Sequence, residues 1–369
     1  MKIVFSTDQI YLHGGIEKVL AEKANYFADV CGYEVIVLTN QQKEKSPCYP
    51  LSKKIQTVDL GINYNREKSY FSWVNLKKVL NHIYQLNRFF YTLQPDVVIV
   101  SNFGFDTYFV PFLYKKAKKI KEFHSSRYFE SQLRNRTTSF FKKKYYQLND
   151  WVESKYDYLV VLNQDEVSCY KSDNAVVIPN PVTIPKVTAN LMNKKVVAAG
   201  RIAPVKGFEK LIEAWKVVHA IAPEWELHFY GEDYLDTQKQ LEEIIKENHL
   251  EKVIFFKGSS SNMTETFMDY SIYTMSSQTE CFPMVLLEAL SVGLPIVSFD
   301  CPNGPRNIIT NGEDGLLAEN QNIKDLAEKI LVLIQKENRR TAFGLAAKVN
   351  SERFSTSVVM QRWINLLNS

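Results

Sequence analysis

The sequence predicts an α/β protein of two doubly wound domains, each with a parallel sheet covered by helices on both faces. Two series of short apolar runs alternate with helical patterns, and a proline-rich stretch separates the two series. Strands that alternate with helices are typical of parallel sheets, because parallel neighbours need a crossover connection. The chain has 369 residues. That length suits two domains of about 150 to 190 residues each.

The first series of predicted strands fills the N-terminal half. Its members are Lys2 to Thr7, Glu34 to Asn40, Lys54 to Gly61, Val97 to Asn102, Ile120 to His124, Tyr158 to Asn163 and Ala175 to Asn180. Three prolines then fall within Ile178 to Pro185. Proline continues neither a helix nor an inner strand, so this stretch is the predicted interdomain linker.

The second series of predicted strands follows the linker. Its members are Lys195 to Gly200, Glu226 to Gly231, Val253 to Gly258, Ser271 to Ser276, Ile296 to Asp300 and the pair Leu316-Leu317. Helical patterns then cover Asn322 to Glu337 and Thr341 to Val349. A last amphipathic segment, Val358 to Leu367, has one apolar face and must pack on another part of the protein.

Composition places the chain among ordinary globular proteins. Hydrophobic residues make up 45% and charged residues 23%. The sequence has no secretory signal pattern and no apolar run of about 18 residues that would cross a membrane. Its five cysteines lack a C-x-x-C spacing, which predicts reduced thiols in the cytoplasm, neither a disulfide frame nor a zinc site.

The chemistry is concentrated between Ser276 and Ile309. A buried strand is predicted to end at a polar elbow that holds Glu280, and Pro283 then starts a helix that contains Glu288. A helix N-terminus attracts anions, and two carboxylates accept hydrogen bonds from hydroxyls, so the arrangement favours a ligand with both phosphate and sugar. The plain alternative is a surface helix with one capping and one solvated glutamate.

The residues around this pair resemble the E-x7-E signature of retaining glycosyltransferases of family 4. After Glu288 come Val292, Gly293 and Pro295, then Ile296 to Asp300, Gly304-Pro305 and Gly312 to Leu317. The resemblance is strongest over residues 195–318. It implies the GT-B fold, two doubly wound Rossmann-like domains facing a central cleft. The N-terminal acceptor-side domain would be 1–182, completed by the C-terminal helix 354–369, and the nucleotide-sugar-binding domain 183–353.

A pair of glycines, Gly14 and Gly15, follows the first predicted strand and opens a helix through Ala28. Glycines there let a backbone approach a phosphate closely, although a tight strand-to-helix connection would need no more. The pair is similar to the family's G-G-x-E loop, which implies that both residues neighbour the diphosphate or the acceptor.

His124 stands at the end of a predicted strand. A lone histidine there is often structural, but ligands collect at the carboxyl edge of a parallel sheet, and histidine suits a sugar hydroxyl. Family members carry His-Ser or His-Gly at this place, so the resemblance implies that His124 lies beside the transferred sugar.

Two cations, Arg201 and Lys206, follow the first strand of the second domain. A guanidinium fork and a compact ammonium can converge on one diphosphate, whereas two solvated surface cations are the plain alternative. The motif resembles the family's G-R-x-x-x-x-K-G, in which both cations neutralise the leaving nucleoside diphosphate. That implies electrostatic catalysis without a metal or another cofactor.

The remaining site residues are carried over from the resemblance. Glu288 corresponds to the acid that holds the ribose, and Glu280 to the acid that faces the donor sugar. The implied donor-binding residues are Gly14, Gly15, Arg201, Lys206, Gly231, Glu280, Phe282, Pro283, Met284, Val285 and Glu288, and the implied catalytic residues are Glu280, His124, Arg201 and Lys206. The chain departs from the family at Asp233, Pro283 and Asn307, which indicates altered contacts with the donor.

A basic, aromatic segment runs from Lys115 to Tyr146, where eleven lysines and arginines against two glutamates give +9, compared with +4 for the whole chain. Such a surface binds nucleic acid or an anionic membrane, and no nucleic-acid motif accompanies it, so membrane or lipid-pyrophosphate contact is preferred to a plain solvated face. A second candidate for membrane contact is an apolar stripe for which core packing against a sheet is the favoured alternative; its members are Trp73, Leu76, Leu80, Ile83 and Phe90.

The predicted function is transfer of a hexose or N-acetylhexosamine from a nucleoside diphosphate sugar, a UDP-sugar first of all, onto a growing or polyprenyl-linked surface glycan such as capsule or lipopolysaccharide. The enzyme would be cytoplasmic and peripheral at the inner face of the cell membrane. Two alternatives remain open, a UDP-sugar enzyme such as an epimerase and a non-catalytic membrane-associated assembly partner.

Overall fold

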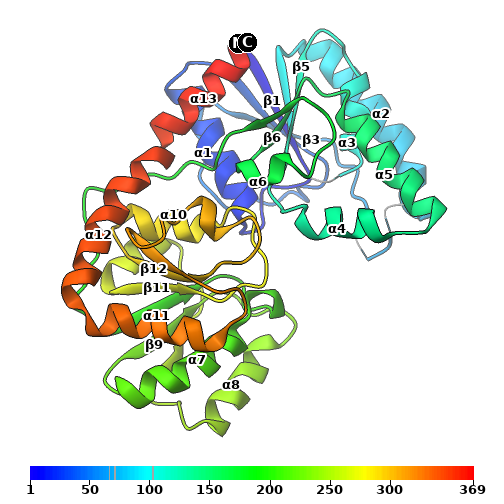
Figure 1. The fold of residues 1–369 in the computed structure, drawn as a ribbon. Helices are drawn as coiled ribbons and strands as arrows, with labels where there is room; N and C mark the ends of the chain where they lie inside the picture. Colours follow the sequence, from blue (N-terminus) through cyan, green and yellow to red (C-terminus); the bar gives the residue numbers. More distant parts are fainter. Residues whose placement is uncertain (66, 70–71, 102–103) are drawn as a thin grey trace. The chain divides into compact units, whose positions relative to one another are not determined.

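The computed structural model describes residues 1–65, 67–69, 72–101 and 104–369 and divides into two compact units (Figure 1). The first unit comprises Met1–Pro179 and Met360–Ser369, and the second comprises Asn180–Val359. The division falls inside the proline-rich stretch. Each unit is an α/β fold around one parallel sheet, the architecture that the alternation of strands and helices predicts.

The first unit contains a seven-stranded sheet in the order β3-β2-β1-β4-β5-β6-β7, with every neighbouring pair parallel. The strands are β1 (Lys2–Thr7), β2 (Glu34–Thr39), β3 (Gln56–Asp59), β4 (Val97–Val100), β5 (Lys118–Glu122), β6 (Tyr158–Val161) and β7 (Ala175–Val177). Every predicted strand of this half is present, most of them shorter at the carboxyl end. Asn102, the predicted end of β4, lies outside the described residues.

The helices of the first unit lie on both faces of this sheet. They are α1 (Gly15–Asp29), α2 (Trp73–Leu93), α3 (Asp106–Phe109), the 3-10 turn η1 (Val110–Phe112), α4 (Tyr128–Arg136), α5 (Phe140–Glu153) and α6 (Gln164–Val167). Buried side chains of α2, α3 and α5 share one core with alternate strand residues such as Val4, so these three helices cover the same face. The other face carries α1, where Phe27 stacks on Phe5 of β1.

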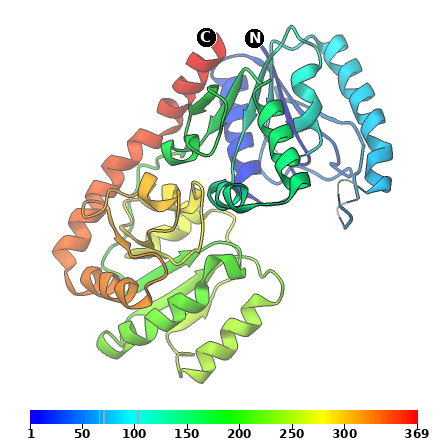
Figure 2. The ribbon, with the colours of Figure 1, turned by 45° about the vertical axis from the view of Figure 1, so that its right-hand side comes forward.

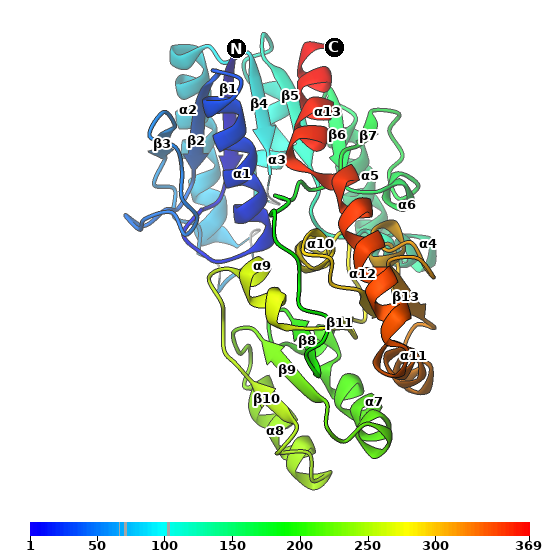
Figure 3. The same cartoon turned by 90° about the vertical axis from the view of Figure 1, so that its left-hand side faces the viewer.

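The C-terminal helix α13 (Thr356–Asn368) has most of its length in the first unit. It lies beside α1, as Figure 1, Figure 2 and Figure 3 show from three sides. Trp363, 2% exposed, packs its ring over the Lys23 ammonium of α1 at 4.5 Å. The apolar face predicted for Val358 to Leu367 thus packs on the first unit, against α1.

The second unit contains a six-stranded sheet in the order β10-β9-β8-β11-β12-β13, again parallel. The strands are β8 (Lys195–Ala199), β9 (Glu226–Tyr230), β10 (Ile254–Phe256), β11 (Ile272–Met275), β12 (Ile296–Phe299) and β13 (Gly315–Ala318). The helices are α7 (Phe208–Ile221), α8 (Thr237–Glu247), α9 (Met263–Thr266), α10 (Met284–Ser291), α11 (Ile323–Gln335) and α12 (Glu337–Ser351). The 3-10 turns are η2 (Pro204–Lys206), η3 (Phe267–Asp269), η4 (Pro305–Asn307) and η5 (Glu352–Phe354). A core around fully buried Trp215 joins α7 and α11 to the sheet.

The predicted boundary between the helices Asn322 to Glu337 and Thr341 to Val349 is wrong. α11 ends at Gln335 and α12 already begins at Glu337. Buried Arg340 explains the sharp junction, because its guanidinium donates hydrogen bonds to the carbonyls of Leu333 and Ile334. These are terminal carbonyls of α11 that have no partner within the helix. A charged residue of α12 therefore caps the preceding helix.

The core packing predicted for the apolar stripe of α2 is wrong at its N-terminal end. Trp73 is 79% and Leu80 77% exposed, while Phe90 is buried. The inward face instead begins with Asn75, which bonds the preceding loop, and His82, which bonds Tyr64 at 3.0 Å. Buried polar groups that hydrogen-bond occupy the positions where the periodicity places apolar ones.

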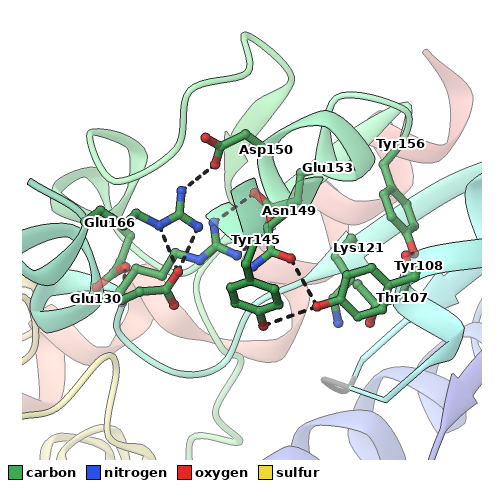
Figure 4. A network of polar contacts seen from close by, with 12 residues as sticks. Thr107, Tyr108, Lys121, Glu130, Tyr145, Asn149, Asp150, Glu153, Tyr156 and Glu166 are labelled. Atoms are coloured by element: carbon green, nitrogen blue, oxygen red, sulfur yellow. Dashed lines mark hydrogen bonds and ion pairs between the residues drawn. The ribbon is translucent and has the colours of Figure 1, made fainter. Parts of the chain in front are cut away.

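The basic segment Lys115–Tyr146 is likewise not one continuous surface. Lys119, Lys121 and Arg127 are buried, the two lysines within β5. Arg127 forms an ion pair with Glu153, and Arg134 forms ion pairs with carboxylates of α4 and α5 (Figure 4). Three of the six exposed cations of the segment, Lys142, Lys143 and Lys144, lie at the start of α5.

Candidate functional site

The second unit brings three predicted site loops to one edge of its sheet. The loops follow β8, β9 and β11, and β8 lies between the other two strands. Because all strands are parallel, their carboxyl ends share an edge, where ligands of doubly wound sheets bind. Arg201 and Lys206 come from the first loop, Gly231 from the second and Glu280 from the third.

Glycines hold these loops close together. Gly231 has a φ of +154°, and a Cβ placed there would lie 1.9 Å from the Gly200 carbonyl oxygen. Gly207 has a φ of +62°, and its Cβ would lie 2.3 Å from the carbonyl oxygen of Ser276. Only glycine adopts these conformations without strain and leaves room for the approaching backbone. The site is therefore built on backbone contacts between neighbouring loops.

Lys206 and Glu280 form the charged centre of this edge. The Lys206 Nζ lies 2.6 Å from the Glu280 Oε1, and both side chains are mostly buried. The Lys206 stem lies against Gly200, where an added Cβ would be 3.2 Å from Cε. The Ser276 hydroxyl also donates a hydrogen bond to the Lys206 carbonyl. The geometry fixes an ammonium and a carboxylate side by side.

Arg201, from the same loop as Lys206, is exposed. Its guanidinium lies 5.4 Å from the Tyr234 ring centroid and has no carboxylate partner among the described residues. A cation without a counter-ion is available to an anionic ligand.

The helix α10 begins at this edge. Pro283 is its N-cap, with φ −68° and ψ 119°, and not its first helical residue as predicted. The N–H groups of Met284 and Val285 find no acceptor in the described part of the chain, whereas that of Leu286 bonds to the Pro283 carbonyl. Unpaired N–H groups of a first helical turn form an anion site.

One aromatic and one acidic side chain, Phe282 and Glu288, lie at the start of α10 and within it. Phe282 is buried, and its ring packs edge-on against Phe354 at 5.5 Å. Glu288 is 4% exposed inside α10, so the solvated surface glutamate of the plain alternative is excluded. Burial, together with the charges of Glu280 and Asp300, raises the pKa of the Cys301 thiol to about 12, which leaves it a neutral packing group.

The first unit carries the predicted residues Gly14, Gly15 and His124. Gly14 is the N-cap of α1 in an extended conformation, and Gly15 is exposed at the first helical position. The Glu17 carboxylate folds back over Gly14 and accepts a 2.5 Å hydrogen bond from Gln9. An extended backbone is open to any residue, so space above the loop, and not strain, favours glycine there.

His124 lies two residues beyond the end of β5, beside a buried charge cluster that the sequence did not reveal. Its Nε2 is 3.7 Å from the Oε2 of Glu122, which ends β5. Glu122 pairs with the fully buried Lys23 of α1 and accepts a 2.6 Å hydrogen bond from the Ser101 hydroxyl. Burial alone would raise the pKa of Glu122, but Lys23 and His124 outweigh it and hold that pKa well below its ordinary value.

The signal that could have found this cluster is the charged pair Lys121-Glu122 inside a segment predicted as an inner strand of the sheet. Within the described residues, no His, Cys, Asp or Glu side chains gather in a group able to hold a metal ion. Nor does any described helix combine the length and apolar character needed to cross a bilayer.

The fold and the candidate site define a two-domain α/β protein whose second unit gathers cations and a helix N-terminus at one sheet edge. Residues 181–349 match the family model "Glycosyl transferases group 1". An uncharacterised glycosyltransferase of Haemophilus influenzae is 27% identical over 99% of both chains. A poly(ribitol-phosphate) α-N-acetylglucosaminyltransferase of Staphylococcus aureus is 31% identical over 57% of this chain and 42% of its own length.

Solved structures show the same fold over the whole chain. A mutant of S. aureus TarM, solved with fondaparinux, α-GlcNAc-glycerol and UDP, aligns with a TM-score of 0.77 at 18% identity, covering all of both chains. The fold is GT-B. The protein is a glycosyltransferase of the GT-B fold, and its match to the group 1 family model covers residues 181–349.

Proposed function

We propose that this glycosyltransferase moves a hexose or N-acetylhexosamine from a UDP-sugar onto a surface glycan, with retention of configuration as in family 4. The acceptor in this proposal is a growing or lipid-linked chain of a capsule, lipopolysaccharide or teichoic acid type. The relative that acts on poly(ribitol-phosphate) and the UDP in the TarM structure support these choices. The observation that carries the proposal is the combination of Arg201, Lys206 and the α10 N-terminus at one sheet edge.

The second unit would bind the nucleotide. Arg201 and Lys206 would neutralise the diphosphate, and the free N–H groups of Met284 and Val285 would hydrogen-bond its oxygens. Gly231 keeps the β9 loop close enough to contact the same ligand. As the glycosidic bond breaks, negative charge grows on the diphosphate, and positive charge that is already in place stabilises it more than the ground state. This group of charges would make a metal ion unnecessary.

The two glutamates of the second unit would bind hydroxyls. Glu288, buried in α10, would accept hydrogen bonds from the ribose, while Glu280 would face the donor sugar. Phe282 and Pro283 would shape the entry to α10. In the first unit, His124 would hydrogen-bond a hydroxyl of the transferred sugar, and Gly14 and Gly15 would neighbour the diphosphate or the acceptor.

The first unit would hold the enzyme peripherally on an anionic membrane at its cytoplasmic face. α2, η1 and α5 cover one face of the sheet, and large apolar side chains point outward along this layer. The exposed set consists of Trp73, Leu80, Tyr84, Tyr91, Phe112, Phe140, Phe141, Tyr145, Leu148 and Trp151. We name this set the aromatic layer.

Charge supports a lipid surface as the partner of the aromatic layer. The sequence of α2 contains no acidic residue, and exposed Lys142, Lys143 and Lys144 begin α5. Aromatic side chains beside lysines are typical of surfaces that lie at a bilayer interface. A ring pair, Phe112 on Trp151 at 5.2 Å, joins η1 to α5 within the layer.

Thermal stabilisation by nucleotides tests the proposal. The native protein is melted with UDP, GDP, ADP and their sugar conjugates in the presence of EDTA, and UDP release is then measured from the stabilising donors. A ligand at 100 times its dissociation constant adds about 2.7 kcal/mol of stability. We expect stabilisation by UDP ligands, retained in EDTA and lost in Lys206→Ala and Glu288→Ala. Stabilisation that depends on a metal, or by no nucleotide, would contradict the proposal.

A further inference from the structure

Glu122 and His124 leave the same strand end of the first unit and face each other. Glu122 is the last residue of β5, 3% exposed, and the His124 side chain is 6% exposed. The Nε2 atom, and not Nδ1, is the ring atom that faces the carboxylate, 3.7 Å from Oε2. In a site without ligand, such contacts are commonly longer than a hydrogen bond and shorten when the ligand binds.

The carboxylate of Glu122 is locked from its other sides. Its Oε1 pairs with the Lys23 ammonium, and its Oε2 accepts the 2.6 Å hydrogen bond from Ser101. Lys23 itself lies between the rings of Phe5 and Trp363, at 5.6 and 4.5 Å from the two centroids. Elements far apart in the sequence thus fix one carboxylate in place.

A locked, ionised carboxylate determines which nitrogen of a neighbouring neutral imidazole carries the proton. Carboxylate oxygens only accept hydrogen bonds, so the nitrogen that faces Glu122 must be the donor. Nδ1 is then left with a free lone pair. In the described structure, no side chain or backbone group bonds to it. An imidazole in this form accepts a hydrogen bond from a hydroxyl through Nδ1.

We propose that Glu122 is a positioning residue for His124, which it holds in the Nε2–H tautomer so that Nδ1 accepts a hydrogen bond from a hydroxyl of the transferred sugar. The inference rests on the proposed role of His124. Lys23 and Trp363 support the arrangement, so the C-terminal helix contributes to the orientation of a residue in the β5 loop. Carboxylates behind metal-bound histidines fix tautomer and ring orientation in the same way.

The experiment compares charge removal at Glu122 with the same change elsewhere in the first unit. Glu122→Gln removes the carboxylate charge but leaves Lys23 buried without its counter-ion. The double variant Lys23→Met with Glu122→Gln restores neutrality and keeps the proposal testable if the single variant unfolds. The matched control is Glu153→Gln, because Glu153 is also a buried carboxylate with a cationic partner, Arg127. Within the described part of the chain, no hydrogen bond or ion pair joins Glu153 to His124.

Two measurements are made on each folded variant of the full chain. Long-range ¹H–¹⁵N correlation spectra report the tautomer of each histidine, and the signals that vanish in His124→Ala identify His124. Steady-state release of UDP from UDP-GlcNAc and UDP-glucose gives kcat and KM. Stabilisation by UDP alone reports whether the nucleotide site of the second unit is intact.

We expect the Nε2–H pattern of His124 in the native protein and in Glu153→Gln, and a mixture of tautomers in both Glu122 variants. Their kcat should fall about 10- to 100-fold, the usual effect of losing such a partner, with KM and UDP stabilisation little changed. An unchanged Nε2–H pattern or a native kcat in the double variant overturns the proposal. A native kcat in His124→Ala, with the tautomer change still present, would instead refute the role of His124 and leave its positioning by Glu122 established.

Discussion

The Lys206 Nζ lies 2.6 Å from the Glu280 Oε1, so the cation proposed for the diphosphate is paired with the carboxylate proposed for the sugar. The two side chains are 22% and 12% exposed, so their attraction is weakly screened by solvent. A phosphate that approaches Lys206 must compete with Glu280, whereas Arg201 of the same loop has no such competitor among the described residues. In the proposed site, Glu280 would therefore affect both the affinity for the nucleotide and the reaction of the sugar.

Glu280→Gln should separate these two effects. Loss of the carboxylate charge frees Lys206 and removes repulsion toward the diphosphate, so UDP should bind about 3- to 10-fold more tightly, as expected for one partly buried charge. The turnover of a UDP-sugar should fall, because the sugar loses its acidic neighbour. Calorimetric titration with UDP and a UDP-release assay measure both quantities. Glu313→Gln, which changes an exposed acid on the β12–β13 connection, is the matched control. Weaker UDP binding in Glu280→Gln would contradict the predicted repulsion between Glu280 and the diphosphate.

Gly231→Ala should destabilise the second unit strongly. The added Cβ would lie 1.9 Å from the Gly200 carbonyl oxygen, at a backbone φ of +154°. Gly312→Ala is the control for backbone strain alone, because its φ is +87° but no atom lies within 4 Å of the added Cβ. Left-handed strain costs about 1 to 2 kcal/mol, so the control should lose that much and Gly231→Ala clearly more. Urea unfolding measures the free energy of unfolding of both variants. Equal losses would show that the close contact between the Gly231 and Gly200 loops adds nothing to the cost of backbone strain.

Lys121 should make stability depend on pH in an unusual direction. Burial lowers its pKa to about 8, although the Asp106 and Glu122 carboxylates oppose the shift. In the unfolded chain a lysine keeps its proton up to a pKa of about 10.4. Between these two values the unfolded state binds more protons, so the contribution of Lys121 to stability rises with pH across that window.

The measurement compares the native protein with Lys121→Met by urea unfolding at several pH values between 7 and 10. The native protein should gain stability relative to the variant as pH rises above 8, by at most on the order of 3 kcal/mol. The comparison removes the titration of tyrosines and cysteines, which both proteins share. A difference that stays constant or shrinks with pH would mean that Lys121 is protonated in the folded state.

The aromatic layer should bind anionic vesicles. Flotation with phosphatidylglycerol and phosphatidylcholine vesicles is expected to recover the native protein, and pure phosphatidylcholine to recover less. Changing Lys142, Lys143 and Lys144 to Glu should abolish the difference between the lipids, because lysines near a charged surface contribute about 1 kcal/mol each. The matched control changes Lys216, Lys239 and Lys246 of α7 and α8, all exposed in the second unit. Equal losses in both triple variants would refute a specific role of α5.

The apolar part of the aromatic layer needs its own variant. Trp73→Ser with Leu80→Ser removes two side chains that are 79% and 77% exposed, so folding should be nearly unaffected. Binding to anionic vesicles should weaken, and salt should then disrupt it more easily. Native vesicle binding in this variant would restrict the membrane contact to α5.

Apolar runs bounded by turn residues were sufficient to locate the strands. The runs Lys2 to Thr7 and Ser271 to Ser276 became β1 and β11 with little change at their ends, because buried parallel strands need continuous apolar sequence. Periodicity failed on α2, where Asn75 and His82 face inward and Trp73 faces outward. A buried polar group that finds a partner through tertiary contact leaves no trace in the period of the sequence.

The candidate site divides in the same way. The family resemblance implied that Lys206 and Glu280 belong to one site, and the structure brings them within contact distance at the shared edge of a parallel sheet. No spacing linked Lys23, Glu122 and Trp363, which lie on three elements that only packing brings together. The burial and pairing of these side chains depend on partners that are far away in the sequence.

The amino-acid sequence by itself determined the two doubly wound sheets, the loops with glycine and cation at their carboxyl ends, and the class of chemistry, since these depend on local pattern and order along the chain. Only the tertiary structure decided which charges are buried in pairs and which face solvent. Lys121 and Lys144 are equally basic in the sequence, yet one is fully buried in β5 and the other exposed on α5. The physical reason is that the free energy of a charge depends on the solvent and the partners around it, and the fold supplies both.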